Sequence, residues 1–286
     1  KDYEKKNFKF FVDQLTYRVT PGVDETSFIK ANFLKDICDG TTRCDISKKQ
    51  AINMLGTMQG GYNVNVLTEF LDDENLAELA CNELKDTLLI FDDFNKIQDK
   101  YKKGNLYAKE LLESWANAEW FIKKEPVAKK IPLIVFKVSG EINTDDLSPA
   151  VDAWSRPDIP LHSLSMLKTP REGIEPDIPY ELGPIKLINE LKQKGNVVFV
   201  GDVVGTGSSR KSATNSILWH FGENIPYVPN KKQGGFCFGG KIAPIFFNTM
   251  EDSGAFPIEL NVDNFYTGQE IELRPYEGTV LDSTGE

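Results

Sequence analysis

The first 125 residues carry apolar side chains at helical spacing, separated by short polar turns. In residues 105–124 the apolar positions recur at steps of three and four, which predicts a helix with one apolar face and Asn105 as its N-cap. A similar stripe from residues 76 to 88 follows Asp72 or Asp73 as its cap. Such consecutive helices predict antiparallel pairs that stack as an α-solenoid or a small bundle.

The pattern changes after the basic, proline-containing segment at residues 123–132. Beyond it, apolar runs typical of strands alternate with helical stripes, which predicts an α/β layer structure. The expected strands are residues 131–140, 197–200, 255–260 and 269–276, and the expected helices are residues 184–195, 208–221 and 243–254. We therefore expect two domains, a helical one over residues 1–125 and an α/β one over residues 126–286.

Residues 145–179 carry several prolines and little periodicity, which predicts an irregular segment. Its apolar side chains, among them Trp154 and Leu161, favour an ordered surface loop over a disordered one.

Composition narrows the classes of function. The formal net charge is −10 and neither half is basic, so the sequence lacks the positive field of sequence-independent nucleic-acid binding. No apolar run approaches the roughly 20 residues that span a bilayer, and no signal-peptide pattern is present, so we expect a cytoplasmic protein without a membrane partner. A chain that opens on Lys1 is also expected to be a segment of a larger protein.

The four cysteines are Cys38, Cys44, Cys81 and Cys237. They form no CxxC pair, which argues against a zinc ribbon and against a disulfide framework. We expect four reduced thiols.

Residues 201–216, GDVVGTGSSRKSATNS, follow an expected strand and fit a phosphate cradle, an active-site loop or an ordinary turn. The spacing matches neither a Walker A loop nor a dinucleotide fingerprint, since Arg210 stands where the third glycine is needed. Gly205 and Gly207 permit a tight turn, and a helix opening at Ser208 offers free N–H groups to an anion. With the planar charge of Arg210, these features predict a carboxylate or phosphate site.

The two serines of this loop have two interpretations. Ser208 or Ser209 is a helix N-cap, worth about 1 kcal/mol, or one hydroxyl acts as a base beside a cation, a helix dipole or a metal. Both interpretations stay open on these residues alone. A serine-hydrolase triad is disfavoured, because neither His162 nor His220 has a GxSxG context, and His220 is expected to be a residue of the helix.

Several long strings closely resemble the bacterial aconitate hydratase B family. They include residues 201–219, residues 142–162 (INTDDLSPAVDAWSRPDIPLH), residues 230–259 and, in the helical half, residues 107–121. The resemblance covers essentially the whole chain. It implies a HEAT-like helical domain followed by a swivelling β/β/α domain, which closes over a [4Fe-4S] cluster held by other domains of the full-length enzyme. The family's cluster ligands are one distant cysteine plus a CxxC, which none of the four cysteines fits, so we expect no metal ligand here and no activity of this segment alone.

The resemblance also implies a reaction and its residues. The reaction is the isomerisation of citrate and isocitrate through cis-aconitate, with dehydration of 2-methylisocitrate as a second activity. Ser208 matches the serine that removes a proton from the substrate carbon. Ser209 and Arg210 match residues that bind a substrate carboxylate, and Arg156 matches a second substrate-binding arginine.

Supporting roles follow from the same resemblance. Asp145 matches an aspartate near the active site, with Asp146 where many relatives have histidine. Gly205 and Gly207 support the turn that carries the serines.

Two other functions are weighed against this one. The first is a protein- or RNA-binding regulatory module, because the resembling family includes members that bind mRNA when the cluster is lost. In that case the helical domain is a candidate for self-association. The negative net charge argues against strong RNA binding by this segment. The other is a free-standing small subunit of an isopropylmalate isomerase-like hydro-lyase. The helical domain and the AWSRPDIP and GTGSSRKS strings fit the aconitases better.

Overall fold

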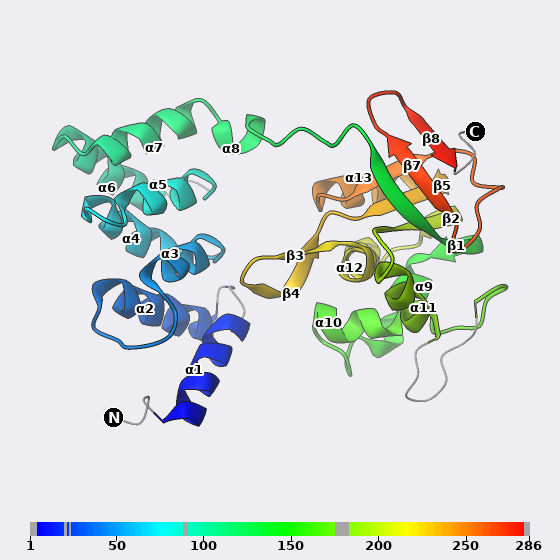
Figure 1. The fold of residues 1–286 in the computed structure, drawn as a ribbon, viewed down its shortest axis with the longest axis horizontal. Coiled ribbons are helices and arrows are strands. Elements are labelled where there is room, and N and C mark those ends of the chain that lie inside the picture. The colour runs from blue at the N-terminus through cyan, green and yellow to red at the C-terminus, as the bar shows by residue number, and fades with distance from the viewer. Residues whose placement is uncertain (1–4, 20–21, 23, 88–90, 175–182, 283–286) are drawn as a thin grey trace. The chain divides into compact units, whose positions relative to one another are not determined.

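The fold is that of a computed structural model (Figure 1). It describes residues 5–19, 22, 24–87, 91–174 and 183–282. The chain forms two compact units. The first holds Lys1–Pro126 with Pro226–Pro229, and the second holds Val127–Ile225 with Asn230–Glu286.

The first unit consists of helices joined by short turns. In the described part of the chain they are α1 (Lys6–Arg18), α2 (Glu25–Asp39), α3 (Lys48–Gly56), α4 (Tyr62–Glu69), the 3-10 turn η1 (Phe70–Asp72), α5 (Ala77–Lys85), α6 (Phe91–Lys102), α7 (Leu106–Ala116) and α8 (Glu119–Ile122). The Asn105 side chain accepts the N–H of Ala108 at 2.8 Å and so caps α7, which confirms the predicted cap.

The N-cap predicted for the helical stripe at residues 76–88 is wrong in position. Helix α5 begins at Ala77, and Leu76 occupies its N-cap without a side-chain bond. Asp73 instead accepts the N–H of Asn75 at 2.8 Å and that of Leu76 at 2.9 Å, because its short carboxylate stabilises the preceding turn. The helix ends at Lys85, and residue 88 of the expected stripe lies outside the described residues.

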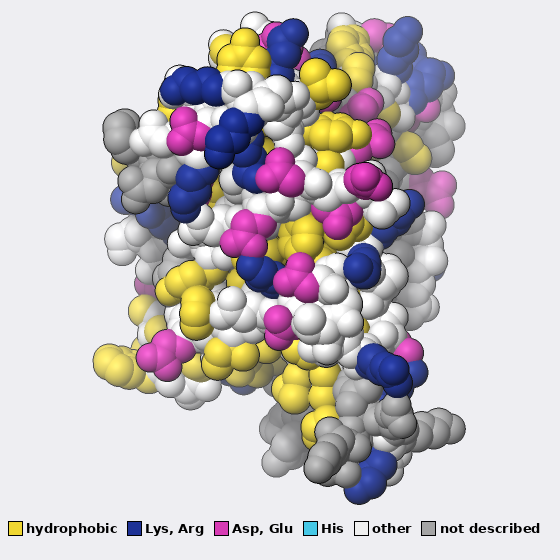
Figure 2. All heavy atoms as spheres, turned by 90° about the vertical axis from the view of Figure 1, so that its left-hand side faces the viewer, with side chains coloured by type: hydrophobic (Ala, Val, Ile, Leu, Met, Phe, Trp, Pro, Cys, Tyr) yellow, Lys and Arg dark blue, Asp and Glu magenta, His cyan; other side chains and the backbone are white. Residues whose placement is uncertain are grey.

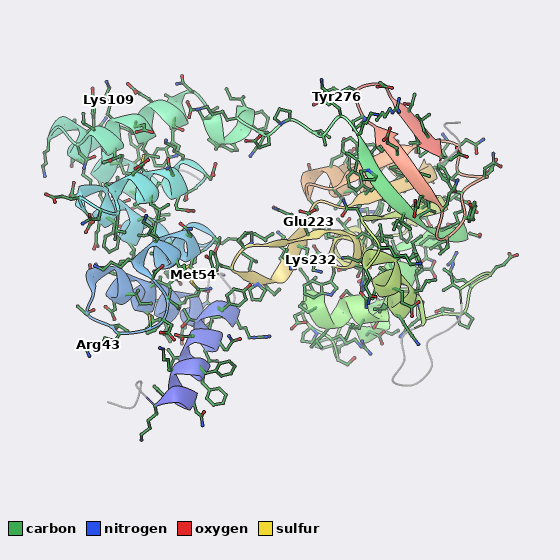
Figure 3. All side chains as sticks on the ribbon, viewed as in Figure 1. Arg43, Met54, Lys109, Glu223, Lys232 and Tyr276 are labelled. Atoms are coloured by element: carbon green, nitrogen blue, oxygen red, sulfur yellow. The ribbon has the colours of Figure 1, made fainter. Side chains whose placement is uncertain are left out.

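The apolar faces of the helices from α2 to α7 share one core. Leu55, Leu84 and Leu111, from three different helices, are fully buried in it. Met54 points into the unit with 2% of its surface exposed, whereas Lys109 lies on the outer side of α7 (Figure 3). The predicted helical region is therefore confirmed.

The second unit combines strands with helices. Its described elements are β1 (Ile131–Asn143), α9 (Thr144–Leu147), η2 (Ala150–Asp152), α10 (Ile159–His162), η3 (Ser163–Ser165), α11 (Gly183–Lys192), β2 (Val197–Thr206), α12 (Arg210–Phe221), β3 (Glu223–Ile225), β4 (Val228–Gln233, which belongs to this unit from Asn230 onward), β5 (Phe236–Ile242), α13 (Pro244–Asp252), β6 (Phe256–Glu259), β7 (Glu270–Arg274) and β8 (Thr279–Asp282).

Six of the described strands form one mixed sheet in the order β6-β5-β2-β1-β7-β8, and β3 pairs with β4 separately. Strands β1, β2, β5 and β6 run parallel, and β7 and β8 are antiparallel additions at the β1 side. Parallel neighbours need a crossover, which the helices between them supply. The predicted α/β character is confirmed, and the predicted strands are present, although β1 and β2 are longer than expected.

The two faces of the sheet bury different sets of side chains. On β1, Ile134, Phe136 and Val138 pack under the helices, whereas Leu133 and Val135 pack on the opposite face. This alternation is the period of two expected for a strand buried on both sides. The helical layer packs over β2 through α11, α12 and α13.

The segment after β1 is more regular than predicted. Residues 144–165 contain the short helical turns α9, η2, α10 and η3 in place of a wholly irregular loop. Asp158 caps α10 by accepting the N–H of Leu161 at 2.8 Å, so polar caps stabilise helices too short to show periodicity. Residues 175–179 of the expected loop lie outside the described residues.

Candidate functional site

The candidate site lies where three parallel strands end. Asn143, at the end of β1, is the register partner of Thr206, at the end of β2. After β5, the N–H of Ala243 donates to the carbonyl of Val204 at 2.9 Å. The carboxyl ends of parallel strands are where open α/β sheets bind ligands.

Two glycines shape the turn after β2. Gly205 has φ +82°, and a Cβ there would lie 2.2 Å from Cγ of Phe246. Gly207 has φ +111°, and a Cβ there would lie 2.5 Å from Oγ1 of Thr144. Positive φ favours glycine, and both positions lack space for a side chain. The turn therefore depends on backbone that approaches its neighbours closely.

Helix α12 begins at Arg210, two residues later than predicted. Ser209 occupies the N-cap position, but its side chain makes no capping bond, so the capping interpretation is wrong for this residue. The physical reason is its backbone, with ψ 44°, which departs from the extended conformation that aims an N-cap hydroxyl at the first turn. Ser208 is exposed, and in the described part of the structure its hydroxyl has no hydrogen-bond partner.

The start of α12 is electropositive. Its first turn carries Arg210 and Lys211 and no acidic side chain. The Arg210 guanidinium donates through Nη1 to the carbonyl of Gly207 at 3.2 Å, which folds it over the turn beside Ser208. A helix N-terminus, its free N–H groups and a guanidinium together favour a bound carboxylate.

Helix α9 brings Asp145 to the same edge from the end of β1. Asn143 caps this helix by accepting the N–H groups of Asp145 and Asp146, at 2.7 and 3.0 Å. Thr144, whose side chain is buried, accepts the N–H of Ser209 at 3.2 Å. The structure thus joins the turn that carries Asp145 to the turn that carries Ser208.

Arg171 holds α9 from the other side. Its Nη1 lies 3.0 Å from Oδ2 of Asp146, and its Nη2 donates to the carbonyl of Ser139 at 3.1 Å. Asp146 in turn accepts the N–H of Asn143 at 2.9 Å and closes a capping box. The sequence reasoning missed Thr144 and Arg171; the N-x-x-D pattern at residues 143–146 was the available signal for the cap.

Arg156 forms hydrogen bonds to backbone carbonyl groups of its own segment. Its N–H donates to the carbonyl of Asp152 at 2.9 Å, and its Nη1 donates to the carbonyl of Leu161 at 3.3 Å. These bonds do not connect it to residues 205–210.

The two histidines are bonded elsewhere. His162 Nε2 lies 3.0 Å from the carbonyl of Pro149 and 3.3 Å from Oγ of Ser148. His220 is a residue of α12, as predicted; it is buried, and its Nε2 lies 2.8 Å from the carbonyl of Ser163. Neither arrangement pairs a histidine with Ser208 as a triad requires.

Comparison with known proteins places the chain in a family. A sequence model described as "Aconitate hydratase 2 N-terminus" matches residues 133–286, and one described as "Aconitate B N-terminal domain" matches residues 1–121. Aconitate hydratase B of Escherichia coli is 58% identical over 281 residues, 97% of this chain and 32% of that protein. The Pseudomonas aeruginosa protein of the same name is 59% identical over 275 residues, 96% of this chain and 32% of that protein. The chain belongs to the aconitate hydratase B family.

The chain spans about a third of the length of the curated relatives that it matches. A solved structure of 3-isopropylmalate dehydratase from Methanocaldococcus jannaschii is 18% identical and covers 55% of this chain and 78% of its own, with a TM-score of 0.37. That similarity is too weak to support the small-subunit alternative.

The cysteines of this chain do not gather into a ligand set for an iron–sulfur cluster within the described residues. Such a cluster needs converging thiolates. Burial raises the pKa of Cys237 to about 12 and that of Cys81 to about 11. Within the described residues there is no group of three or more His, Cys, Asp or Glu side chains that could hold a metal ion.

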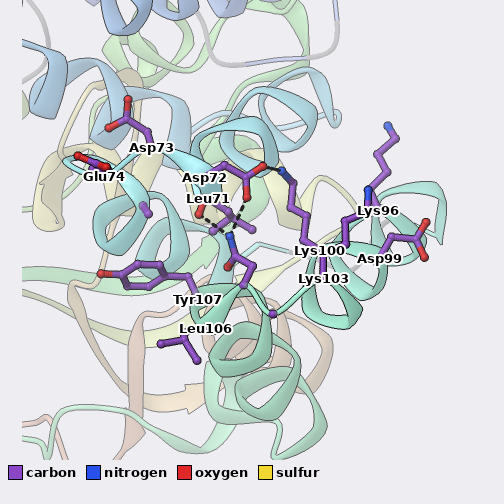
Figure 4. Close-up of a pocket in the computed structure, with 13 residues that line it drawn as sticks. Leu71, Asp72, Asp73, Glu74, Lys96, Asp99, Lys100, Lys103, Leu106 and Tyr107 are labelled. Atoms are coloured by element: carbon purple, nitrogen blue, oxygen red, sulfur yellow. Dashed lines mark hydrogen bonds and ion pairs between the residues drawn. The ribbon is translucent and has the colours of Figure 1, made fainter.

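A cavity of about 690 Å³ lies elsewhere, in the helical unit (Figure 4). Asn105 donates there to the carbonyl of Leu71 at 2.7 Å and to Oδ1 of Asp72 at 2.8 Å, and Lys100 pairs with Asp72. These groups satisfy one another and connect η1 to α6 and α7. The cavity contains none of the candidate site residues.

The surface of the helical unit carries mixed charge. Figure 2 shows basic and acidic side chains interspersed on one face of this unit. That face therefore presents no continuous positive field for RNA among the residues that the structure describes. None of the described helices combines the length and the apolar character needed to cross a membrane.

Proposed function

We propose that this chain is the N-terminal part of a hydro-lyase that interconverts citrate and isocitrate through cis-aconitate, with 2-methylisocitrate as a further substrate. The observation that carries the proposal is the exposed Ser208 hydroxyl beside Arg210 and the N-terminus of α12. The relatives that match almost the whole chain are named aconitate hydratase B. The geometry and the family support the same reaction class.

In this proposal Ser208 is the base that takes a proton from the substrate carbon. A serine alkoxide is a strong base and needs positive surroundings to form. Arg210 and the helix dipole supply them, because α12 has no acidic side chain in its first turn.

The other site residues bind the substrate carboxylates or support the site. Arg210, with Ser209, holds one substrate carboxylate, and Arg156 holds another. A guanidinium suits this role because it binds both oxygens of a carboxylate. Asp145 supports the site from α9.

The domain assignment is part of the same proposal. Residues 1–125 are a HEAT-like domain, and residues 126–286 are the swivelling domain that closes over the substrate. The described cysteines do not fit a [4Fe-4S] cluster, so we assign the cluster to other domains of the full-length protein. Those domains and the tricarboxylate are the partners of this segment in the cytoplasm, and the segment alone is inactive.

The test compares Ser208→Ala with Ser212→Ala in the full-length protein. Ser212 is also exposed and lies in the first turn of α12. We expect Ser208→Ala to lower kcat by about 10²-fold or more, the usual contribution of a positioned base, with KM little changed. Ser212→Ala should keep both values. Near-normal turnover of Ser208→Ala would refute the assignment of the base.

A further inference from the structure

The Thr144 hydroxyl lies between the two turns that carry the site. Thr144 is the first residue of α9 and is 1% exposed. A buried hydroxyl needs a hydrogen-bond partner, and here Oγ1 accepts the N–H of Ser209 at 3.2 Å. The bond spans residues that lie 65 positions apart in the sequence.

A second contact lies on the other side of Ser208. The Cα of Gly207 approaches Thr144 so closely that a Cβ there would lie 2.5 Å from Oγ1 and 3.5 Å from the backbone nitrogen. The residues before and after Ser208 therefore both contact Thr144. Two such restraints limit the directions in which the Ser208 hydroxyl can point.

Thr144 is itself firmly held. Asn143, next to it, pairs in register with Thr206 and caps α9. The ion pair between Arg171 and Asp146 fixes the same turn of helix, and both side chains are mostly buried. A movement of Thr144 would break these bonds as well, so it is a rigid point of reference for the serine turn.

We propose that Thr144 is a positioning residue for Ser208. This inference rests on the proposed function, because it gives Ser208 the role of the base. Without the Thr144 hydroxyl, the N–H of Ser209 loses its acceptor and the turn samples other conformations. A misplacement of about 1 Å at a reacting group can cost on the order of 10²-fold in rate.

The experiment compares three variants of the full-length protein. Thr144→Val removes the acceptor and keeps the shape, and Thr144→Ser keeps the hydroxyl. Thr214→Val is the matched control: Thr214 is fully buried in α12, and its hydroxyl has no hydrogen-bond partner in the described structure. We expect Thr144→Val to lower kcat at least about tenfold with KM within about twofold, and Thr144→Ser and Thr214→Val to stay near the unsubstituted values.

Hydrogen exchange supplies a readout independent of turnover. Amide exchange in a peptide spanning residues 205–212 should speed up in Thr144→Val and stay unchanged in Thr144→Ser and Thr214→Val. Thr144→Ala, which removes the hydroxyl without adding a methyl to the contact, should give the same result if Thr144→Val folds poorly.

The outcomes separate this inference from the proposed function. If kcat and amide hydrogen exchange in Thr144→Val match the unsubstituted protein while Ser208→Ala is inactive, the positioning role of Thr144 is wrong and the assignment of Ser208 as the base is retained. If Ser208→Ala keeps its turnover, the proposed function fails, and the positioning role fails with it. Unchanged exchange with a lowered kcat would also overturn the role, because the turn would then be ordered without the bond.

Discussion

The packing of Gly205 on Phe246 gives a stability prediction that can be worked from the structure. Gly205 is buried at the end of β2 with φ +82°. In Gly205→Ala the new Cβ would lie 2.2, 2.3 and 2.6 Å from three atoms of Phe246, which is itself fully buried. Either the ring or the turn that carries Ser208 must therefore move.

Two costs add in this variant. Left-handed backbone costs an alanine about 1–2 kcal/mol, and overpacking a filled core costs about 1–3 kcal/mol. We expect the free energy of unfolding of the α/β unit to fall by about 2–5 kcal/mol.

Gly254→Ala is the matched control. Gly254 has φ +76°, and a Cβ there would meet nothing within 4 Å. This variant carries the backbone cost without the overpacking, so we expect a loss of about 1–2 kcal/mol. The smaller entropy of the unfolded chain affects both variants alike and cancels in the comparison.

The assay is hydrogen exchange in peptides from β2, measured against urea, which reports the free energy of opening of this unit. Adding Phe246→Ala should make Gly205→Ala cost no more than Gly254→Ala, because the clashing ring is gone. If Gly205→Ala alone destabilises no more than Gly254→Ala, the close packing of the turn on Phe246 is refuted.

Two titratable groups with shifted pKa values give predictions of opposite sign. Desolvation of Glu83, together with the nearby charge of Asp86, raises the pKa of the Glu83 carboxyl from 4.5 to about 7. The carboxyl group of Glu83 packs against Gly56. The folded helical unit therefore prefers the neutral form of Glu83. Its stability should therefore fall as pH rises from 4.5 to about 7, and Glu83→Gln should remove this dependence in urea unfolding; an unchanged pH profile would contradict it. Burial lowers the pKa of His220 from 6.5 to about 4, so the α/β unit should keep its stability above pH 6.5 and lose it as pH falls towards 4. Exchange in α12 peptides at pH 7 and pH 5 tests this, and equal stability at both values would contradict it.

Local signals in the sequence predicted much of the fold. Asn105 before an apolar stripe was enough to place the start of α7, because an N-cap acts within one turn. The apolar run at residues 131–140 predicted β1, which the sheet buries on both faces. Gly205 and Gly207 predicted a tight turn, and both have the positive φ that such a turn requires.

Features that depend on distant partners were not predicted. Strand β5 contains Gly239 and Gly240, which weaken a strand pattern, and it forms because β2 and β6 flank it. Thr144 has no distinguishing local pattern, since its partner Ser209 is far along the chain. The capping interpretation fails for Ser209 because the neighbouring contacts determine the backbone of the turn.

The most direct test of the central claim is the single-turnover rate of citrate conversion by the full-length Ser208→Ala protein, measured with enzyme in excess over citrate and at enzyme concentrations that saturate the rate. Saturation removes any contribution from weaker binding and leaves the step in which a proton is taken from the substrate. The account predicts a rate at least about 10²-fold below that of the unsubstituted protein. A rate within about twofold of the unsubstituted protein would contradict it.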